Sequence, residues 1–236
     1  MKKFKKHLPS IVYTFAMLLL IEIAFRIMVG QMNLKMPDLS KQKPEKLFTL
    51  SPFNPAEAGQ KLTDTIFYTF EATDTDNWTF FDFSRGSVVP DITSPREPKG
   101  WDLVFSRAKI AANGGDKSNK GQVSVAKLET TDFNSITKVP ENTKLENAIS
   151  PHPIPENNNA SLEKWYKYTF WDHFLKSYKN VFIIKTAEGN YAKMQIINFY
   201  CKKKEKRISS CYTIQYVYQG NGSKSFVNCE SKPMSQ

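Results

Sequence analysis

Histidine is the residue type in this chain best suited to metal binding or acid–base chemistry, and the sequence contains three. His7 lies in a basic N-terminal stretch, His152 stands between two prolines, and His173 lies in an aromatic-rich run. A neutral imidazole can ligate a metal or exchange a proton near neutral pH. The competing interpretations are structural: His173 bonded to the backbone or to Asp172, and His152 exposed in a loop.

No known catalytic arrangement accompanies these histidines. The sequence contains no G-x-S-x-G turn, H-E-x-x-H helix, Walker loop or Rossmann fingerprint. A hydrolase built on Asp172 and His173 would lack an identifiable nucleophile. The glycine pair at 114–115 indicates a turn, because no helix follows it that could hold phosphate. We therefore predict no catalytic residues and a protein that is not an enzyme.

The elements that would position these residues are expected to be β-strands. Residues 179–186 and 191–200 are β-branched and aromatic runs, and the turn at 188–190 contains the Gly and Asn typical of a tight reversal. In the second run, apolar residues alternate with Lys193 and Gln195. One face of this predicted hairpin should therefore meet a core, and the other should tend toward water.

Further runs of β-branched and aromatic residues occur along the chain. A third strand is expected at 211–219, and upstream runs occur at 64–70, 78–83, 101–112 and 122–128. No long amphipathic helical pattern separates them, which indicates an all-β, antiparallel domain, either a sandwich or an open barrel. The polar, proline-bearing stretch 132–161 is interpreted as a long loop within this domain.

Two cysteines are placed to form a disulfide. Cys201 ends one predicted strand and Cys211 begins the next, so a hairpin between them would bring the two sulfurs within bonding range. Such a bond is typical of exported proteins. Cys229 is left over, as a free thiol or an alternative partner. No CxxC or nearby histidine accompanies it, so no cysteine-based metal site is predicted.

The N-terminus is expected to be a membrane helix. Four lysines at 2–6 precede a mainly apolar span over 8–30, and 23 residues at about 1.5 Å each can cross a bilayer of about 30 Å. Glu22 and Arg26 are one turn apart and can neutralise each other. We predict one transmembrane signal anchor, with a cleaved signal peptide and a merely buried helix as alternatives. The predicted organisation is a cytoplasmic basic flank at 1–7, the anchor at 8–30, a linker at 31–60, the β domain at 61–228, and a C-terminal tail at 229–236.

The positive charge is confined to two places. Of the net charge of +10, the leading lysines and the 202–207 cluster account for +4 each. The rest of the chain is close to neutral, which argues against nucleic acid as a partner. The 202–207 cluster is interpreted as a solvated hairpin tip, or alternatively as a contact for anionic lipid, polysaccharide or an acidic partner.

Several motifs, in order, resemble the HmuY family. They are the W-D-L-x-F-x-R block at 101–107, the W-Y-x-Y run at 165–168, the A-x-G-x-Y-A-K hairpin at 187–193 and the cysteine-bearing strands of 201–216. The resemblance covers roughly residues 65–220. It implies an all-β, haem-binding protein of the bacterial envelope that acts as a hemophore and passes haem to an outer-membrane receptor.

The resemblance also implies a site. It makes His173 and His152 the candidate haem ligands, with no metal expected beyond haem iron. In the histidine-type members one ligand follows the W-x-x-aromatic strand; that position is Phe170 here, which cannot ligate iron. The aromatic residues near His173 are first of all expected in the core and in strand pairing. As a pocket for haem or another flat hydrophobic ligand, the candidates are Trp165, Tyr168, Phe170 and Trp171.

Two functions follow as expectations. The first is a membrane-anchored, extracytoplasmic HmuY-like binding protein in haem or iron uptake, exposed to the periplasm or cell surface, with an envelope receptor as partner. The second is a non-haem envelope protein that binds a protein or glycan partner. In either case, Arg107 is expected to pair with a core carboxylate, Asp102 or Asp82, rather than with a haem propionate.

Overall fold

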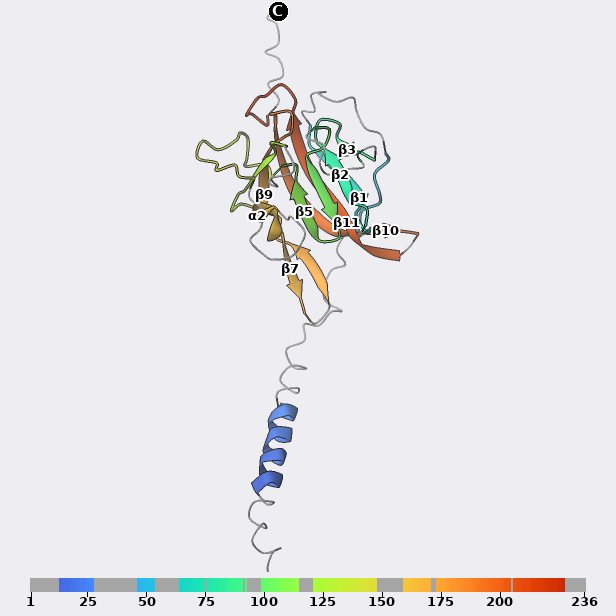
Figure 1. Ribbon diagram of the computed structural model, residues 1–236, viewed down its shortest axis with the longest axis vertical. Coiled ribbons are helices and arrows are strands. Elements are labelled where there is room, and N and C mark those ends of the chain that lie inside the picture. Colours follow the sequence, from blue (N-terminus) through green and yellow to red (C-terminus); the bar gives the residue numbers. More distant parts are fainter. Residues whose placement is uncertain are drawn as a thin grey trace, which may run out of the picture. The chain divides into compact units, whose positions relative to one another are not determined.

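The computed structural model describes residues 13–27, 46–53, 64–74, 76–90, 92, 99–114, 121–147, 159–170, 173–204 and 206–227. The chain divides into two units, Met1–Glu45 and Lys46–Gln236. The second unit consists of β-strands and one short described helix, α2 (Ala160–Glu163), as Figure 1 shows.

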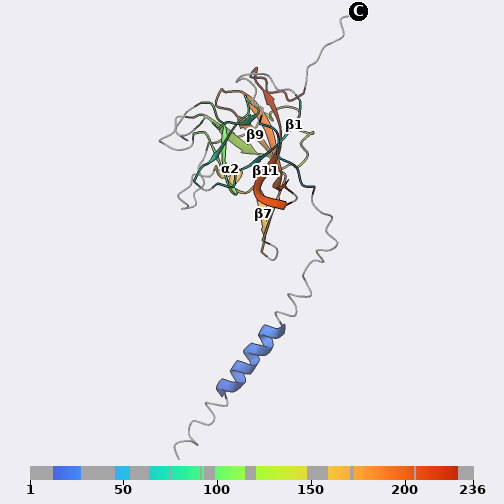
Figure 2. The same cartoon turned by 90° about the vertical axis from the view of Figure 1, so that its right-hand side faces the viewer.

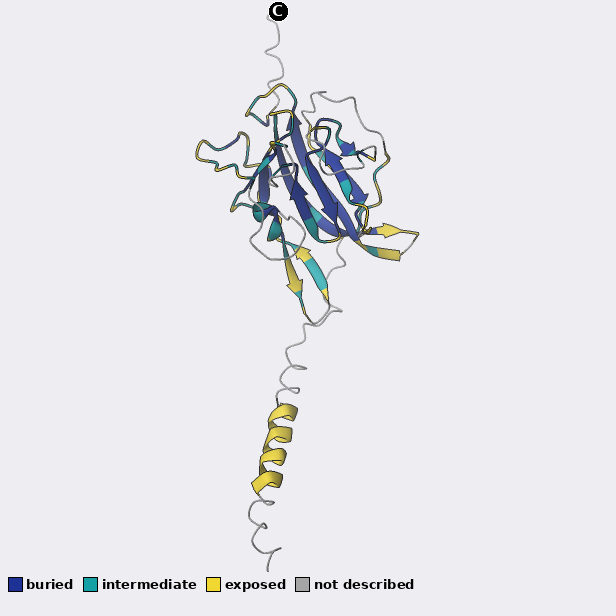
Figure 3. Ribbon diagram, in the orientation of Figure 1, coloured by how far each residue is buried: buried dark blue, intermediate teal, exposed yellow. Residues whose placement is uncertain are grey.

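The first unit contains a described helix over residues 13–27. Its side chains are exposed throughout (Figure 3), and Glu22 and Arg26 form the expected ion pair, with 2.7 Å between Oε1 and Nη2. Among the described residues, no helix is both long and apolar enough to cross a membrane. The predicted transmembrane anchor over 8–30 is therefore wrong for this structure. Its described helical residues rise only about 22 Å, against about 30 Å of hydrocarbon.

Two antiparallel sheets form the main body of the second unit (Figures 1 and 2). The larger sheet has the order β1 (Ile66–Glu71), β11 (Lys206–Gln219), β10 (Tyr191–Lys203), β9 (Val181–Lys185) and β6 (Ser124–Lys127). The smaller sheet has the order β3 (Ser87–Val88), β2 (Thr79–Asp82), β4 (Leu103–Ser106) and β5 (Lys109–Ala112). Every pairing in both sheets is antiparallel, which confirms the predicted strand arrangement.

The core lies between the two sheets. Phe70 of β1 packs against Phe105 of β4 with 4.9 Å between ring centroids, and Phe81 of β2 packs against Tyr216 of β11 at 5.6 Å. All four side chains are buried, and the same dark blue core is visible in Figure 3. Because side chains from both inner faces interdigitate, the unit is a β-sandwich, one of the two arrangements that the sequence left open.

Most strands lie where the sequence predicts them, with two differences in detail. The hairpin β9–β10 turns at Gly189, whose φ is +84°. The predicted run 101–112 is instead two strands, because Arg107 adopts a φ of +52° and reverses the chain between β4 and β5. The strand predicted at 211–219 also begins earlier, since β11 starts at Lys206 and is paired there with Lys203 of β10.

The outer face of β10 is buried rather than exposed to solvent. Lys193 and Gln195, expected to tend toward water, are 5% and 3% exposed. The Lys193 ammonium donates to the carbonyls of Phe133 and Ile136, both at 2.9 Å, and Gln195 donates to Thr131 at 2.8 Å. The expectation is wrong at these positions because the 131–139 loop folds back over the sheet.

A separate two-stranded hairpin projects from one end of the sandwich. It consists of β7 (Tyr166–Thr169) and β8 (Phe174–Ser177), which pair only with each other. Figures 1 and 2 show it standing away from both sheets. Tyr168 and Phe170 of the aromatic run are thus exposed on this arm, whereas Tyr166 and Phe174 pack against the core.

Candidate ligand site at the β7–β8 hairpin

Trp165 anchors the base of the hairpin. Its side chain is 1% exposed, and its indole Nε1 donates to the carbonyl of Ala108 at 3.0 Å. Its ring lies 5.4 Å from the ring of Phe199 and 5.4 Å from that of Tyr212, measured between centroids. Trp165 therefore belongs to the core, and the structure does not place it in a ligand pocket.

The second strand of the hairpin is attached through Tyr200 of β10. The Phe174 ring stacks on the Tyr200 ring at 4.1 Å, and the Tyr200 hydroxyl accepts from the Leu175 backbone N–H at 3.0 Å. The Arg207 guanidinium lies over both rings, 4.7 Å from Phe174 and 5.2 Å from Tyr200. Stacking and cation–π contact together give the arm a defined direction, although its tip is exposed.

His173 lies at the tip, next to two exposed aromatic side chains. Its backbone φ is +52°, in the left-handed region that a tight reversal requires. The Tyr168 hydroxyl is hydrogen-bonded to His173 Nδ1, and the Phe170 ring lies 6.0 Å from the imidazole. Tyr168 is 47% exposed and Phe170 is 68% exposed. The tip thus presents an imidazole and two rings to solvent.

The hydrogen bond to Tyr168 decides which ring nitrogen of His173 is available. Nδ1 is occupied, whereas Nε2 has no hydrogen-bond partner among the residues that the structure describes. A histidine held through one nitrogen presents the other in a fixed orientation, which is the usual arrangement of a metal-ligating imidazole. Binding of a metal through Nε2 would require the tautomer in which Nδ1–H donates to the Tyr168 oxygen.

The other predicted site residues divide into two groups. Tyr168 and Phe170 accompany His173 at the tip, whereas Trp165 is buried below it. His152 and Trp171 lie outside the described residues, so their distances from His173 are not defined.

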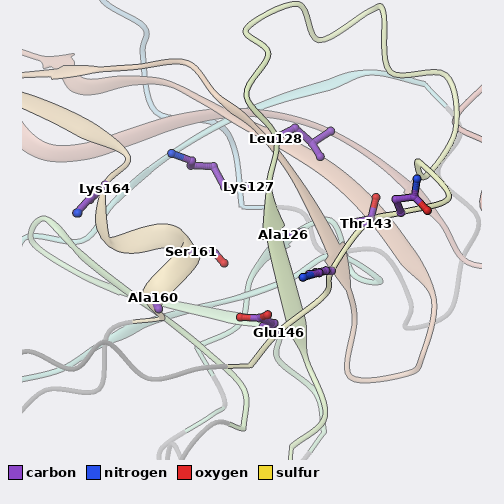
Figure 4. Close-up of a pocket in the computed structure, with 10 residues that line it drawn as sticks. Ala126, Lys127, Leu128, Thr143, Glu146, Ala160, Ser161 and Lys164 are labelled. Atoms are coloured by element: carbon purple, nitrogen blue, oxygen red, sulfur yellow. The ribbon is translucent and has the colours of Figure 1, made fainter.

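A pocket of about 420 Å³ lies beside the strand β6 and the helix α2, near where the chain enters the hairpin (Figure 4). Its charged lining consists of Lys127, Lys144, Lys164 and Glu146, and its apolar lining is limited to Ala126, Leu128 and Ala160. Among the described residues that line it, none is aromatic. A polar or anionic group suits this pocket better than the face of a porphyrin does.

Comparison with known proteins shows the family to which this β-sandwich and hairpin belong. The HmuY protein family matches residues 74–216. The chain belongs to the HmuY family. This match spans the strands from β2 to β11 and includes the whole β7–β8 hairpin.

Several solved structures resemble the chain at low sequence identity. Apo PinO from Porphyromonas gingivitis superposes with a TM-score of 0.50 at 18% identity, covering 66% of this chain and 98% of that one. The Tannerella forsythia apo HmuY analog gives 0.49 at 16% identity, covering 68% and 99%. A candidate HmuY-like haem-binding protein from Bacteroides vulgatus gives 0.49 at 20% identity, covering 66% and 93%. No curated protein matches the chain significantly.

The HmuY-family chain also carries a disulfide close to this site. Cys201 of β10 and Cys211 of β11 are bonded, with 5.5 Å between their Cα atoms. They are not direct register partners, since Cys201 pairs with Ile208; Ser210, with a φ of +56°, bends β11 between them. Cys229 lies outside the described residues. The bond closes the base of the β10–β11 hairpin tip, which carries Arg207. The Arg207 guanidinium lies over Phe174 of the β7–β8 hairpin.

The polar pocket is the part of the site that the sequence did not indicate. Its lysines come from β6, a loop and the residue that follows α2, and they are separated by up to 37 positions along the chain, from Lys127 to Lys164. A sparse set of lysines in an otherwise Lys-rich chain carries no recognisable pattern. Only the local cluster of aromatics around His173 was strong enough to be recognised.

Proposed function

We propose that this HmuY-family chain binds haem, with His173 at the tip of the β7–β8 hairpin as a ligand to the iron. One observation carries the proposal: the Tyr168 hydroxyl is hydrogen-bonded to Nδ1 of His173, so that in the tautomer with Nδ1–H as the donor Nε2 is the nitrogen that can bind iron. Membership of the HmuY family supports it, and a relative in that fold class is described as a candidate haem-binding protein.

The surroundings of His173 fit a flat, apolar cofactor. The exposed rings of Tyr168 and Phe170 offer contact to a porphyrin on either side of the ligating imidazole. Neutral imidazole is a normal axial ligand of haem iron. Phe170 cannot ligate, so the position expected from the family pattern does not supply the ligand. His173, three residues further on, takes that role in our proposal, with His152 as the candidate for the second ligand.

The proposed location is extracytoplasmic. The Cys201–Cys211 disulfide supports it, because such bonds persist in oxidising compartments and are rare in the cytosol. A protein that holds haem on an exposed arm is suited to transfer it, so an envelope receptor is the proposed partner. The exposed tip of the arm, with Tyr168 and Phe170, is the part available for such a contact.

The test is a titration of the full-length protein with hemin, followed by visible absorbance. We expect a shifted, sharpened Soret band with wild-type protein and its loss in His173→Ala. His7→Ala is the matched control, because it removes a histidine far from the hairpin in sequence and should bind as wild type. His152→Ala should weaken binding and change the band position. A spectrum identical to that of free hemin with wild-type protein contradicts haem binding.

A second candidate function rests on the pocket beside α2. Its lysines and sparse apolar lining suit a carboxylate or another anionic group on a protein or glycan. A chain that leaves hemin unbound, and that binds such a partner only while Lys127 and Lys164 are intact, would be the interaction protein of this second interpretation. Substitution of both lysines by Met separates the two functions, because the hairpin tip is left unchanged.

A further inference from the structure

Three carboxylates meet at one end of the sandwich, away from the residues used above. Asp82 ends β2, Asp102 immediately precedes β4, and Glu188 lies in the turn between β9 and β10. One carboxylate oxygen of each lies within 4.8 Å of the others. Asp82 and Asp102 are both 0% exposed, whereas Glu188 is exposed. Two sheets therefore contribute acidic groups to one small volume.

The hydrogen bonds of the two aspartates leave one oxygen unpaired. Asp102 accepts the backbone N–H of Phe83 at 2.8 Å through Oδ2 and that of Ala187 at 2.7 Å through Oδ1. Asp82 Oδ1 accepts the Ser84 backbone N–H at 2.7 Å. Asp82 Oδ2 is buried and has no hydrogen-bond partner among the described residues. A buried anionic oxygen without a partner is costly unless a proton or a cation neutralises it.

Little side-chain positive charge reaches the cluster: among the described residues, the charge of Lys99 only partly opposes the raised pKa of Glu188. Arg107, expected to pair with Asp102 or Asp82, is exposed on the β4–β5 turn, and that expectation is wrong. Within the described part of the chain, no lysine or arginine forms an ion pair with any of the three carboxylates. Burial raises the pKa of Asp102 well above its usual value, and the charges of Asp82 and Glu188 raise it further. The three carboxylates therefore repel one another when they are ionised.

We infer that Asp82, Asp102 and Glu188 form a binding site for a divalent cation of the calcium type. Carboxylate oxygens are the ligands that Ca²⁺ prefers, and Ca²⁺ accepts irregular geometry of the kind that three separate segments provide, whereas Mg²⁺ requires a near-ideal octahedron. The buried hydroxyl of Thr186, two residues before Glu188, interacts with the Glu188 carboxylate and is a further candidate oxygen ligand. The exposed Glu188 gives an ion access from solvent.

The inferred ion would join the two sheets at this end. Asp82 and Asp102 belong to the smaller sheet, and Glu188 belongs to a turn of the larger one. The Ala187 N–H to Asp102 bond already crosses between them at 2.7 Å. An ion held by all three carboxylates would strengthen this connection, and it would stabilise only the folded chain.

The experiment is calorimetric titration of the EDTA-treated full-length protein with CaCl₂, in the absence of hemin. We expect one Ca²⁺ per chain, a higher melting temperature in Ca²⁺, and weaker binding of Mg²⁺. Asp82→Asn should abolish binding, and Glu188→Gln should weaken it by about tenfold or more. Asp132→Asn is the matched control, because Asp132 Oδ1 also accepts backbone N–H groups from the residues two and three positions later, but at an exposed turn.

Two results would overturn the inference. One is the absence of both heat and thermal shift with millimolar Ca²⁺, and the other is unchanged affinity in Glu188→Gln. The glutamine variant keeps the test decisive if Asp82→Asn does not fold, because Glu188 is exposed and glutamine keeps the size of the side chain and one oxygen that accepts hydrogen bonds. Since hemin is omitted, the outcome is independent of haem binding.

Discussion

The Tyr168 hydroxyl is hydrogen-bonded to Nδ1 of His173 across the tip of the β7–β8 hairpin. Tyr168 comes from β7 and His173 from the reversal before β8, so the pairing of the two strands sets the contact. This relationship turns an exposed histidine into an oriented one. In the proposed haem site Tyr168 is a positioning residue, whose loss should affect ligand binding more than folding.

Tyr168→Phe should weaken hemin binding by about tenfold while leaving the free energy of unfolding nearly unchanged. The phenylalanine keeps the ring but removes the hydroxyl that fixes Nδ1, so His173 can rotate and change tautomer. Hemin titration gives the affinity, and urea unfolding gives the stability. Tyr178→Phe is the matched control, since Tyr178 is 50% exposed and forms no contact with His173. Equal affinities for wild type and Tyr168→Phe would contradict the positioning role.

Removal of the disulfide by Cys201→Ser with Cys211→Ser should lower the free energy of unfolding by about 2 to 3 kcal/mol. The cysteines are 10 positions apart, and the bond restricts this short loop in the unfolded chain. Chemical denaturation with and without reductant measures the effect. Reductant should destabilise the wild type but not the double variant. Cys229→Ser should behave as wild type, and a loss of stability there would implicate Cys229 in a bond.

Stability should depend on pH through Lys193. Burial lowers the pKa of this ammonium from 10.5, with Asp132 partly opposing the shift. The unfolded chain therefore binds more protons than the folded one between the lowered pKa and 10.5, so this contribution to stability rises with pH across that window. Urea unfolding at several pH values tests it. The difference between wild type and Lys193→Met should grow in favour of wild type as the pH rises, and a flat or falling difference would contradict the sign.

The core tyrosines should lower the stability as the pH rises above 10, which is opposite to the effect of Lys193. Burial raises the pKa of Tyr218 to about 12, and the nearby Glu188 charge adds to the shift. Burial raises the pKa of Tyr216 above that of Tyr218. The folded chain keeps these phenols protonated above pH 10, where they ionise in the unfolded chain, so stability falls as the pH rises above 10. Tyr218→Phe should reduce this alkaline loss. Phenolate absorbance during titration provides the readout, and ionisation of all tyrosines near pH 10 in folded protein would refute it.

The strands were predictable because their signals are local. The β9–β10 hairpin combines a glycine turn with β-branched flanks, and each feature is readable within a few residues. The burial of Lys193 was not readable, because the loop that covers it comes from residues 131–139, about 60 positions earlier. The alternation of apolar and polar residues predicts a strand, but it does not show which distant segment covers the outer face of that strand.

The site was only partly predictable for a related reason. The aromatic run around His173 has the composition of a core strand, and nothing in it shows that β7 and β8 leave both sheets as a separate arm. The carboxylate cluster was harder still, since Asp82, Asp102 and Glu188 come from three distant segments and each looks like an ordinary turn or strand-end residue. Only the folded arrangement of the two sheets brings them together.

The central claim, that His173 ligates haem iron, is tested most directly by chemical rescue. His173→Gly in the full-length protein is mixed with hemin, and the visible spectrum is recorded before and after addition of free imidazole. We predict that the variant lacks the shifted Soret band of the wild type and that imidazole restores it, because the small molecule occupies the vacated ligand position. A wild-type spectrum in His173→Gly without imidazole would contradict the claim.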